Sequence, residues 1–179
     1  MRIYITDLEA YNNGHLVGEW YELPMNKDLL AESVENVLNA GKKACKSTYY
    51  HEEVFITDYE AEISVEEYDD IYKLNKIAEI LENYSEDELQ KFKFLSHEGY
   101  DEKEIIKTGI DNYEVEIYDF SGNTSFTDTF ELLAIQFVDD GLYGEIPKSL
   151  EFYIDYERIA RDLRMDYSEL ESNIIGRVA

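Results

Sequence analysis

The stretch from Glu52 to Asp70 constrains this chain more than any other, because it is dense in carboxylates and contains no lysine or arginine. Exposed carboxylates at this spacing repel one another by a few tenths of a kcal/mol per pair. Val54, Phe55 and Ile63 are interleaved with the acids, which favours a folded segment over a disordered one. Such a segment presents a solid negative face to solvent. Its acids are Glu52, Glu53, Asp58, Glu60, Glu62, Glu66, Glu67, Asp69 and Asp70.

The whole chain shares this acidity. Its 179 residues carry a formal net charge of −25, and hydrophobic residues at 44% suffice for a folded core. A charge of this sign excludes unaided binding to nucleic acid or anionic membranes and favours partners with basic surfaces. The single cysteine, Cys45, excludes an intrachain disulfide and is typical of a reducing compartment. With no signal peptide and no stretch of transmembrane length, the sequence predicts a soluble cytoplasmic protein.

The periodicity of apolar residues predicts an α+β chain of three small domains: 1–62, 63–110 and 111–179. The first reads as an antiparallel sheet with one helix, the second as a helical bundle and the third as mixed α+β. No repeat or Pro/Ser-rich linker separates them, so we expect them to abut. A row of small units also spreads the negative charge, which predicts an elongated arrangement.

Turn and capping residues set the expected element limits. The first domain is predicted to hold strands at 2–8, 15–23 and 53–58, with a tight hairpin turn at 11–14. Its helix is predicted to run from the Asn26 cap to about Ala40 and to end at Gly41. In the middle domain, capping boxes at Ser64 and Ser85 begin two helices, and 101–108 forms a third. The last domain is predicted to contain a strand at 113–118, helices capped by Thr127 or Asp128 and by Asp155, then a final strand and a frayed tail.

No pattern in the chain indicates catalysis. The three histidines are far apart and none stands in a metal-ligand spacing, and no phosphate loop or dinucleotide-binding glycine motif is present. With 41 acidic residues, a pair of carboxylates somewhere carries no information. We therefore predict no catalytic residue, no cofactor-binding residue, no metal ligand and no cofactor, and expect a protein that is not an enzyme.

Three explanations of the acidity remain open on composition: a merely solvated surface, cation buffering, and imitation of a polyanion. Duplex DNA carries one negative charge per roughly 1.7 Å of axis, so a net charge of this size corresponds to about 12 base pairs. The acids are also distributed along the whole chain rather than collected in a tail. Both observations suit a continuous track of negative charge.

Three blocks of sequence bear on this choice. The first holds Ile3, Tyr4, Ile5, Leu8, Tyr11, Asn12, Gly14, Leu16, Gly18 and Trp20. The second holds Glu67, Tyr68, Ile71, Leu74 and Asn75, followed by Glu86, Glu88 and Leu89. The third holds Gly144, Glu145, Ile146, Pro147, Leu150, Tyr153, Ile154, Asp155, Tyr156, Ala160, Arg161, Asp162 and Leu163. In these blocks the chain resembles the ArdA anti-restriction proteins of mobile elements and phages.

The resemblance implies a DNA mimic that occupies the DNA-binding groove of type I restriction-modification enzymes, chiefly the specificity and methylase subunits, and so evades host defence and protects incoming mobile DNA. It also implies an elongated homodimer joined through the C-terminal domains. The expected phosphate-mimicking acids are those of 52–70 named above with Glu79, Glu82, Glu86, Asp87, Glu88, Glu114, Glu116 and Asp119. The expected motif and dimer region comprises Gly144, Glu145, Ile146, Pro147, Tyr153, Asp155, Tyr156, Arg161 and Asp162.

Alternatives to this function remain. One is an acidic mimic aimed at another DNA-handling or defence protein, such as a CRISPR effector. Another is an acidic cation-binding protein or an enzyme, for which a saturable effect of calcium or substrate on thermal stability would be the indication. The blocks also have a plainer reading, in which Gly14, Gly18, Trp20, Tyr153 and Tyr156 serve turns, core or interface packing.

Overall fold

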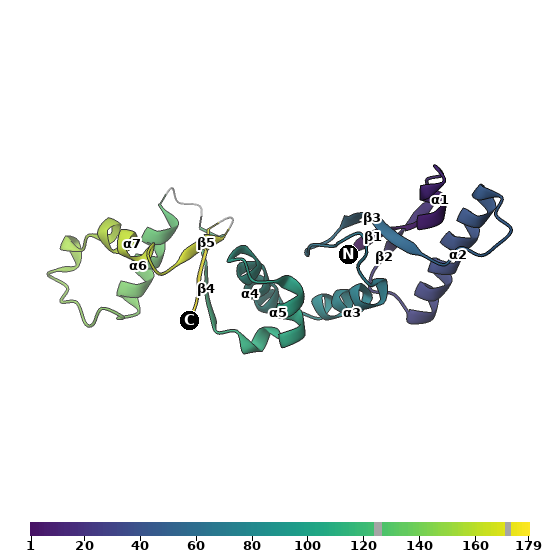
Figure 1. The fold of residues 1–179 in the computed structure, drawn as a ribbon. Helices are drawn as coiled ribbons and strands as arrows, with labels where there is room; N and C mark the ends of the chain where they lie inside the picture. Colours follow the sequence, from purple (N-terminus) through teal and green to yellow (C-terminus); the bar gives the residue numbers. More distant parts are fainter. Residues whose placement is uncertain (124–126, 171–172) are drawn as a thin grey trace. The chain divides into compact units, whose positions relative to one another are not determined.

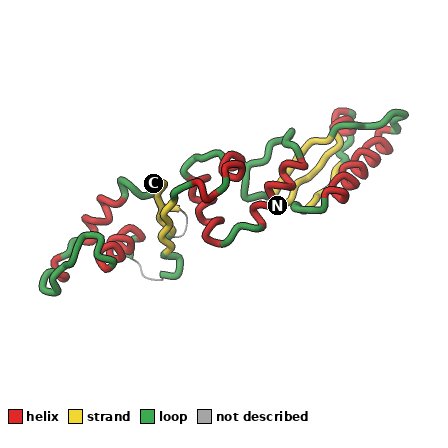
Figure 2. Tube along the Cα trace, turned by 90° about the horizontal axis from the view of Figure 1, so that it is seen from below, coloured by secondary structure: helices red, strands yellow, loops and turns green. Residues whose placement is uncertain are grey.

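A computed structural model describes residues 1–123, 127–170 and 173–179. It divides into two compact units, Met1–Ser85 and Glu86–Ala179 (Figure 1). Each unit combines helices with one three-stranded antiparallel sheet, whose strands are yellow in Figure 2, so the predicted α+β class is confirmed. The helices predicted for a middle domain are shared between the two units, and the division into three domains stays a prediction.

The sheet of the first unit has the order β2-β1-β3, with both pairs antiparallel. Its central strand is apolar on the covered face: Ile3 and Ile5 are completely buried, as period-two alternation predicts. The strands are β1 (Arg2–Asp7), β2 (Gly18–Glu22) and β3 (Val54–Glu60). Pairing of the two first strands was expected from the sequence and is confirmed.

The connection between those strands differs from the predicted tight hairpin. A short helix, α1 (Leu8–Asn12), follows β1 directly, because the Asp7 carboxylate accepts a hydrogen bond from the backbone N–H of Ala10 at 2.6 Å and begins the helical turn. The chain reverses only afterwards, at Gly14, whose φ of +80° suits glycine.

Helix α2 (Lys27–Cys45) begins at Asn26 as predicted, with the Asn26 side chain accepting from the N–H of Asp28. The expected stop at Gly41 is wrong, because the helix continues to Cys45 and ends at Lys46 in the left-handed conformation. Glycine stands at position 41 for a different reason, because a β-carbon at this position would collide with the Asp7 carboxylate. The glycine therefore serves close packing inside the helix rather than its end.

Helix α3 (Ile71–Glu82) begins later than the predicted capping box at Ser64. Its cap is Asp70, whose carboxylate accepts from the backbone N–H groups of Tyr72 and Lys73. Residues 63–70 instead form a non-helical connection. As expected from helical spacing, Ile71, Leu74 and Ala78 are buried.

The second unit contains the sheet β4-β6-β5. The predicted caps Asp128 and Asp155 accept hydrogen bonds from the first turns of their helices, so those helix starts are confirmed. Asp101, at the start of the helix predicted over 101–108, caps its helix in the same way. The elements in chain order are α4 (Glu86–His97), α5 (Glu102–Thr108), the 3-10 helix η1 (Ile110–Asn112), β4 (Val115–Asp119), α6 (Thr129–Asp139), the 3-10 helix η2 (Glu151–Tyr153), α7 (Tyr156–Leu163), β5 (Ser168–Leu170) and β6 (Ile174–Val178).

The end of the chain is not the frayed tail that the sequence predicted. Strand β6 pairs with β4 on one side and β5 on the other, which makes it the central strand of its sheet. Ile175 is completely buried in a core with Phe130, Leu133 and Phe137 of α6. The final strand was expected, but its central position depends on pairing over long sequence separations.

Candidate functional site

The acids of 52–70 lie on the surface. All of them are exposed except Asp69, which is half-buried. Phe55 and Ile56 of β3 are buried against the core, whereas Thr57, Asp58, Tyr59 and Glu60 are exposed. The segment therefore folds through its apolar residues and keeps its charge in solvent, as the interleaved sequence predicts.

Several of these acids also have local structural partners. Glu60 forms an ion pair with Arg2 at 3.0 Å, and Asp69 accepts a hydrogen bond from the N–H of Glu66 at 2.8 Å. Asp70 caps α3, and Asp58 accepts from the N–H of Tyr59 at 2.8 Å. Each of these carboxylates stabilises the local chain, whatever else it contacts.

The remaining predicted acids are spread over both units. Glu79 and Glu82 are exposed on α3, and Glu86 and Asp87 are exposed in the first turn of α4, where negative charge also complements the helix dipole. Glu88, in the same turn, is half-buried.

In the second unit, Glu114 lies directly before β4 and is exposed. Glu116 of β4 is half-buried and accepts two hydrogen bonds from Arg177, at 3.0 and 2.9 Å. These bonds hold the pKa of Glu116 below its usual value. Asp119 is exposed, and hydrogen bonds from Ser121 and Gln90 lower the pKa of its carboxyl group. Both carboxylates are therefore held in the charged form.

The predicted motif region contains an exposed apolar surface. Phe152 is 94% exposed and Tyr153 is 82% exposed, so Tyr153 is not a core residue, whereas Tyr156 is partly buried against the core of the unit. Gly144 has a φ of +86° in an exposed loop with Glu145 and Pro147, beside the half-buried Ile146. Leu142, Tyr143 and Leu150 add to the exposed apolar residues of the same segment.

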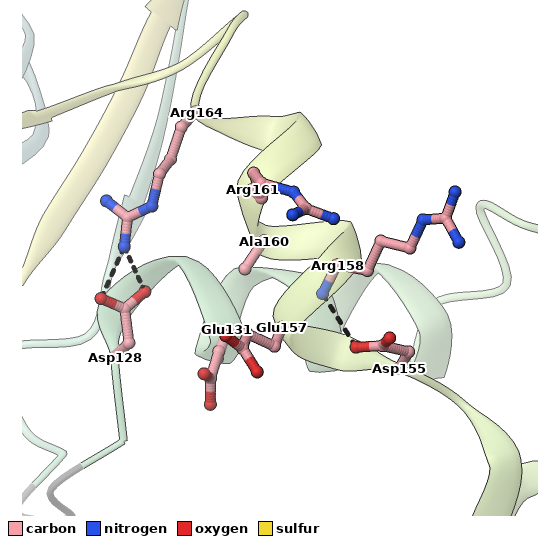
Figure 3. A pocket seen from close by; sticks show the side chains of 8 residues that line it. All are labelled: Asp128, Glu131, Asp155, Glu157, Arg158, Ala160, Arg161 and Arg164. Atoms are coloured by element: carbon pink, nitrogen blue, oxygen red, sulfur yellow. Dashed lines mark hydrogen bonds and ion pairs between the residues drawn. The ribbon is translucent and has the colours of Figure 1, made fainter.

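Three arginines lie in helix α7 or directly after it. A hollow of about 400 Å³ lies between α7 and the start of α6. Figure 3 shows the side chains that line it, which include Arg158, Arg161 and Arg164 and the carboxylates Asp128, Glu131, Asp155 and Glu157. Arg164 donates two hydrogen bonds to Asp128, both at 2.6 Å, and its guanidinium lies 4.1 Å from the Phe130 ring centroid. The predicted motif residues Arg161 and Asp162 are both exposed.

A buried pair of polar side chains could not be found from the sequence. His51 Nδ1 lies 2.7 Å from Asp7 Oδ2, and neither side chain is accessible to solvent. The two residues stand 44 positions apart, so no local pattern could have joined them. The contact holds His51, directly before Glu52 and Glu53, against Asp7 at the end of β1.

The residues that the structure describes contain neither a metal-binding cluster nor a membrane-spanning helix. Within residues 1–123, 127–170 and 173–179, no group of three or more histidine, cysteine, aspartate or glutamate side chains is arranged to hold a metal ion. In the same ranges no helix is long and apolar enough to cross a membrane.

These features define an acidic α+β protein whose carboxylates lie mainly on its surface. The family model described as "Antirestriction protein (ArdA)" matches residues 3–174, nearly the whole chain. The chain therefore belongs to the ArdA family of antirestriction proteins, and the resemblance in the three sequence blocks is confirmed. No curated protein matches it.

Proposed function

We propose that this chain inhibits type I restriction-modification enzymes by mimicking DNA. Its acidic surface would occupy the DNA-binding groove formed by the specificity and methylase subunits and keep incoming mobile DNA from being cut. The family membership supports an antirestriction function. The main support for mimicry is the segment 52–70. Its carboxylates are exposed on a folded scaffold, and it contains no basic residue.

In this mechanism, carboxylates take the place of phosphates opposite lysine and arginine side chains of the target. Binding releases the counterions that surround both charged surfaces, so affinity falls steeply as salt concentration rises. The binding energy is spread over many weak contacts, each worth little by itself. No bond is made or broken, which is why the proposal needs no catalytic group or cofactor.

We also propose the assembly that the sequence resemblance implies. Three small domains per chain, divided near residues 62 and 110, would form an elongated homodimer through the motif region. The exposure of Phe152 and Tyr153 in that region supports a protein contact there, because large apolar side chains in a contiguous exposed segment commonly mark interaction sites.

An in vitro assay tests the proposal. A purified type I enzyme is given unmodified plasmid DNA, and the protein is titrated in at low and at moderate salt. We expect inhibition of cleavage at low salt that weakens as salt is raised, and a complex with the specificity and methylase subunits in gel filtration. Uninhibited cleavage at low ionic strength would refute the type I assignment, and other DNA-handling enzymes tested in parallel would reveal a different target.

A further inference from the structure

Tyr68 is a large aromatic residue that the fold leaves on the surface. Its side chain is 72% exposed, and its ring stacks on Phe55 with a centroid distance of 6.0 Å and an interplanar angle of 21°. Tyr11 of α1 packs edge-on against the same Phe55 at 5.2 Å and is 51% exposed. Phe55 itself is only 5% exposed, so a buried ring supports two exposed tyrosines.

The backbone around Tyr68 is held in place. The N–H of Ile56 in β3 donates to the carbonyl of Glu67 at 2.8 Å, and the N–H of Glu66 donates to the Asp69 carboxylate at 2.8 Å. Ile63 and Val65, just before, are buried anchors. The ring is therefore presented by an ordered connection, which lowers the entropy lost when a partner binds to it.

The charge around this platform determines what it can receive. Glu66 and Glu67 directly precede Tyr68 and are exposed, and the sequence from 52 to 70 offers no lysine or arginine to neutralise them. An aromatic face beside carboxylates attracts a cation through the ring quadrupole and through direct charge. Arginine suits this arrangement better than lysine, because its planar guanidinium stacks on a ring and donates to a carboxylate at the same time.

We infer that the Tyr68 platform, defined as Tyr11, Phe55 and Tyr68 with Glu66 and Glu67, receives an arginine side chain from the basic groove of the target. This inference rests on the proposed function for the identity of the partner. It adds a localised contact to an interface otherwise made of dispersed charges. Tyrosine and arginine are the residue types in which interface binding energy most often concentrates.

Substitutions at Tyr68 separate the ring from the charge, because none of them changes the net charge of the chain. Binding to a purified complex of type I specificity and methylase subunits is measured for the wild type, Y68F and Y68S. We expect Y68S to bind about tenfold more weakly, as the loss of a desolvated cation–π contact implies, and Y68F to bind nearly as well as the wild type. The charge-neutralising control E32Q, at an exposed acid outside the predicted set, should change affinity by less than about twofold.

The outcomes distinguish the platform from the proposed function. If the wild type binds and Y68S binds equally well, the platform is refuted while DNA mimicry stands. If the wild type does not bind, the proposed function fails for this enzyme, and a second measurement decides on the platform. In that measurement, N-acetyl-arginine amide is titrated into the labelled protein and followed by NMR, with the neutral isostere N-acetyl-citrulline amide as control.

The platform predicts saturable shifts of the Tyr68 and Glu67 signals with the arginine amide only, and a reduced shift of the Glu67 signal in Y68S. Equal responses to both compounds, or arginine-dependent shifts that Y68S leaves unchanged, would overturn it. Far-ultraviolet circular dichroism of Y68S checks that the fold is kept, which the 72% exposure of the side chain leads us to expect.

Discussion

His51 and Asp7 form a side-chain hydrogen bond that is completely enclosed, with 2.7 Å between His51 Nδ1 and Asp7 Oδ2. The other Asp7 oxygen accepts from the N–H of Ala10, and the carboxylate fills the space beside Gly41. His51 Nε2 is buried without a hydrogen bond, and its nearest carboxylate oxygen is Glu9 Oε2 at 3.7 Å. The end of β1, α1, α2 and the start of the acidic segment thus meet at one buried carboxylate.

Removal of one partner from this pair should destabilise the protein strongly. H51Q would remove the histidine partner of the buried Asp7 carboxyl group, and we expect a loss of about 2 kcal/mol in the free energy of unfolding of the first unit. Urea denaturation followed by circular dichroism measures this loss. H15Q is the matched control, because His15 is exposed and its replacement should change stability by less than about 0.5 kcal/mol. Equal stability of the two variants would contradict the role given to the pair.

The same residues show which parts of the fold can be predicted from sequence. Caps such as Asn26, Asp128 and Asp155 act on backbone groups within three residues, so their chemistry is visible locally, and the structure confirms them. Gly41 looked like a helix stop by the same local rule. Glycine is needed at position 41 because a β-carbon there would collide with Asp7. Asp7 lies far away in the sequence, and so the prediction failed.

The candidate site shows the same limit. Exposure of the acids in 52–70 could be predicted, because hydrophilic residues alternate there with residues that need a core. The ion pairs of the acids could not be predicted from the sequence. Glu116, for example, meets Arg177 across 61 positions, because β4 pairs with β6. The aromatic platform of Tyr68 was equally hidden, because it depends on Phe55 from another element.

The pair of Glu116 and Arg177 should contribute stability that depends on pH. Its hydrogen bonds lower the folded-state pKa of Glu116 below the usual value of 4.5. The unfolded chain therefore takes up the proton first as pH falls, and the contribution is present above about pH 4.5 and lost as pH falls through the lower folded-state pKa.

Denaturation of the wild type and E116Q at a series of pH values tests this sign. We expect E116Q to be less stable at pH 7, and the difference to shrink as pH falls below 4.5. The comparison between two chains cancels the general relief of charge repulsion on acidification. Because both side chains are more than one third exposed, the difference at pH 7 should be modest. A difference that grows on acidification would contradict the assigned pairing.

The proposed mimicry predicts a collective response to charge removal. Neutralising one predicted acid, as in E52Q, should change inhibition of a type I enzyme by less than about twofold. Neutralising six together should weaken binding by at least about 100-fold and flatten its dependence on salt. The six are Glu52, Glu53, Glu79, Glu82, Glu86 and Asp87, all exposed.

A control of equal charge makes this comparison specific. The second sextuple variant neutralises six exposed acids outside the predicted set: Glu32, Glu35, Asp111, Asp139, Asp140 and Glu169. Both variants carry the same net charge, so equal losses would show that total charge matters and the predicted set does not. A single substitution that abolishes inhibition would instead indicate a catalytic or a strictly local site.

The exposed aromatic residues of the motif region make a prediction about assembly. Phe152 and Tyr153 expose 94% and 82% of their surface, a state that is unfavourable in water unless a partner covers the rings. If they form the homodimer contact, the double variant F152S/Y153S should be monomeric in sedimentation velocity at concentrations where the wild type is dimeric. The exposed Met165 of the same unit provides the control M165S, which should leave the association state unchanged.

A wild type that is monomeric at every concentration, or a double variant that still dimerises, would remove this surface from the proposal. Because the rings are exposed, their loss should leave the unfolding midpoint of the second unit nearly unchanged, so that a change in mass reports on association and not on folding.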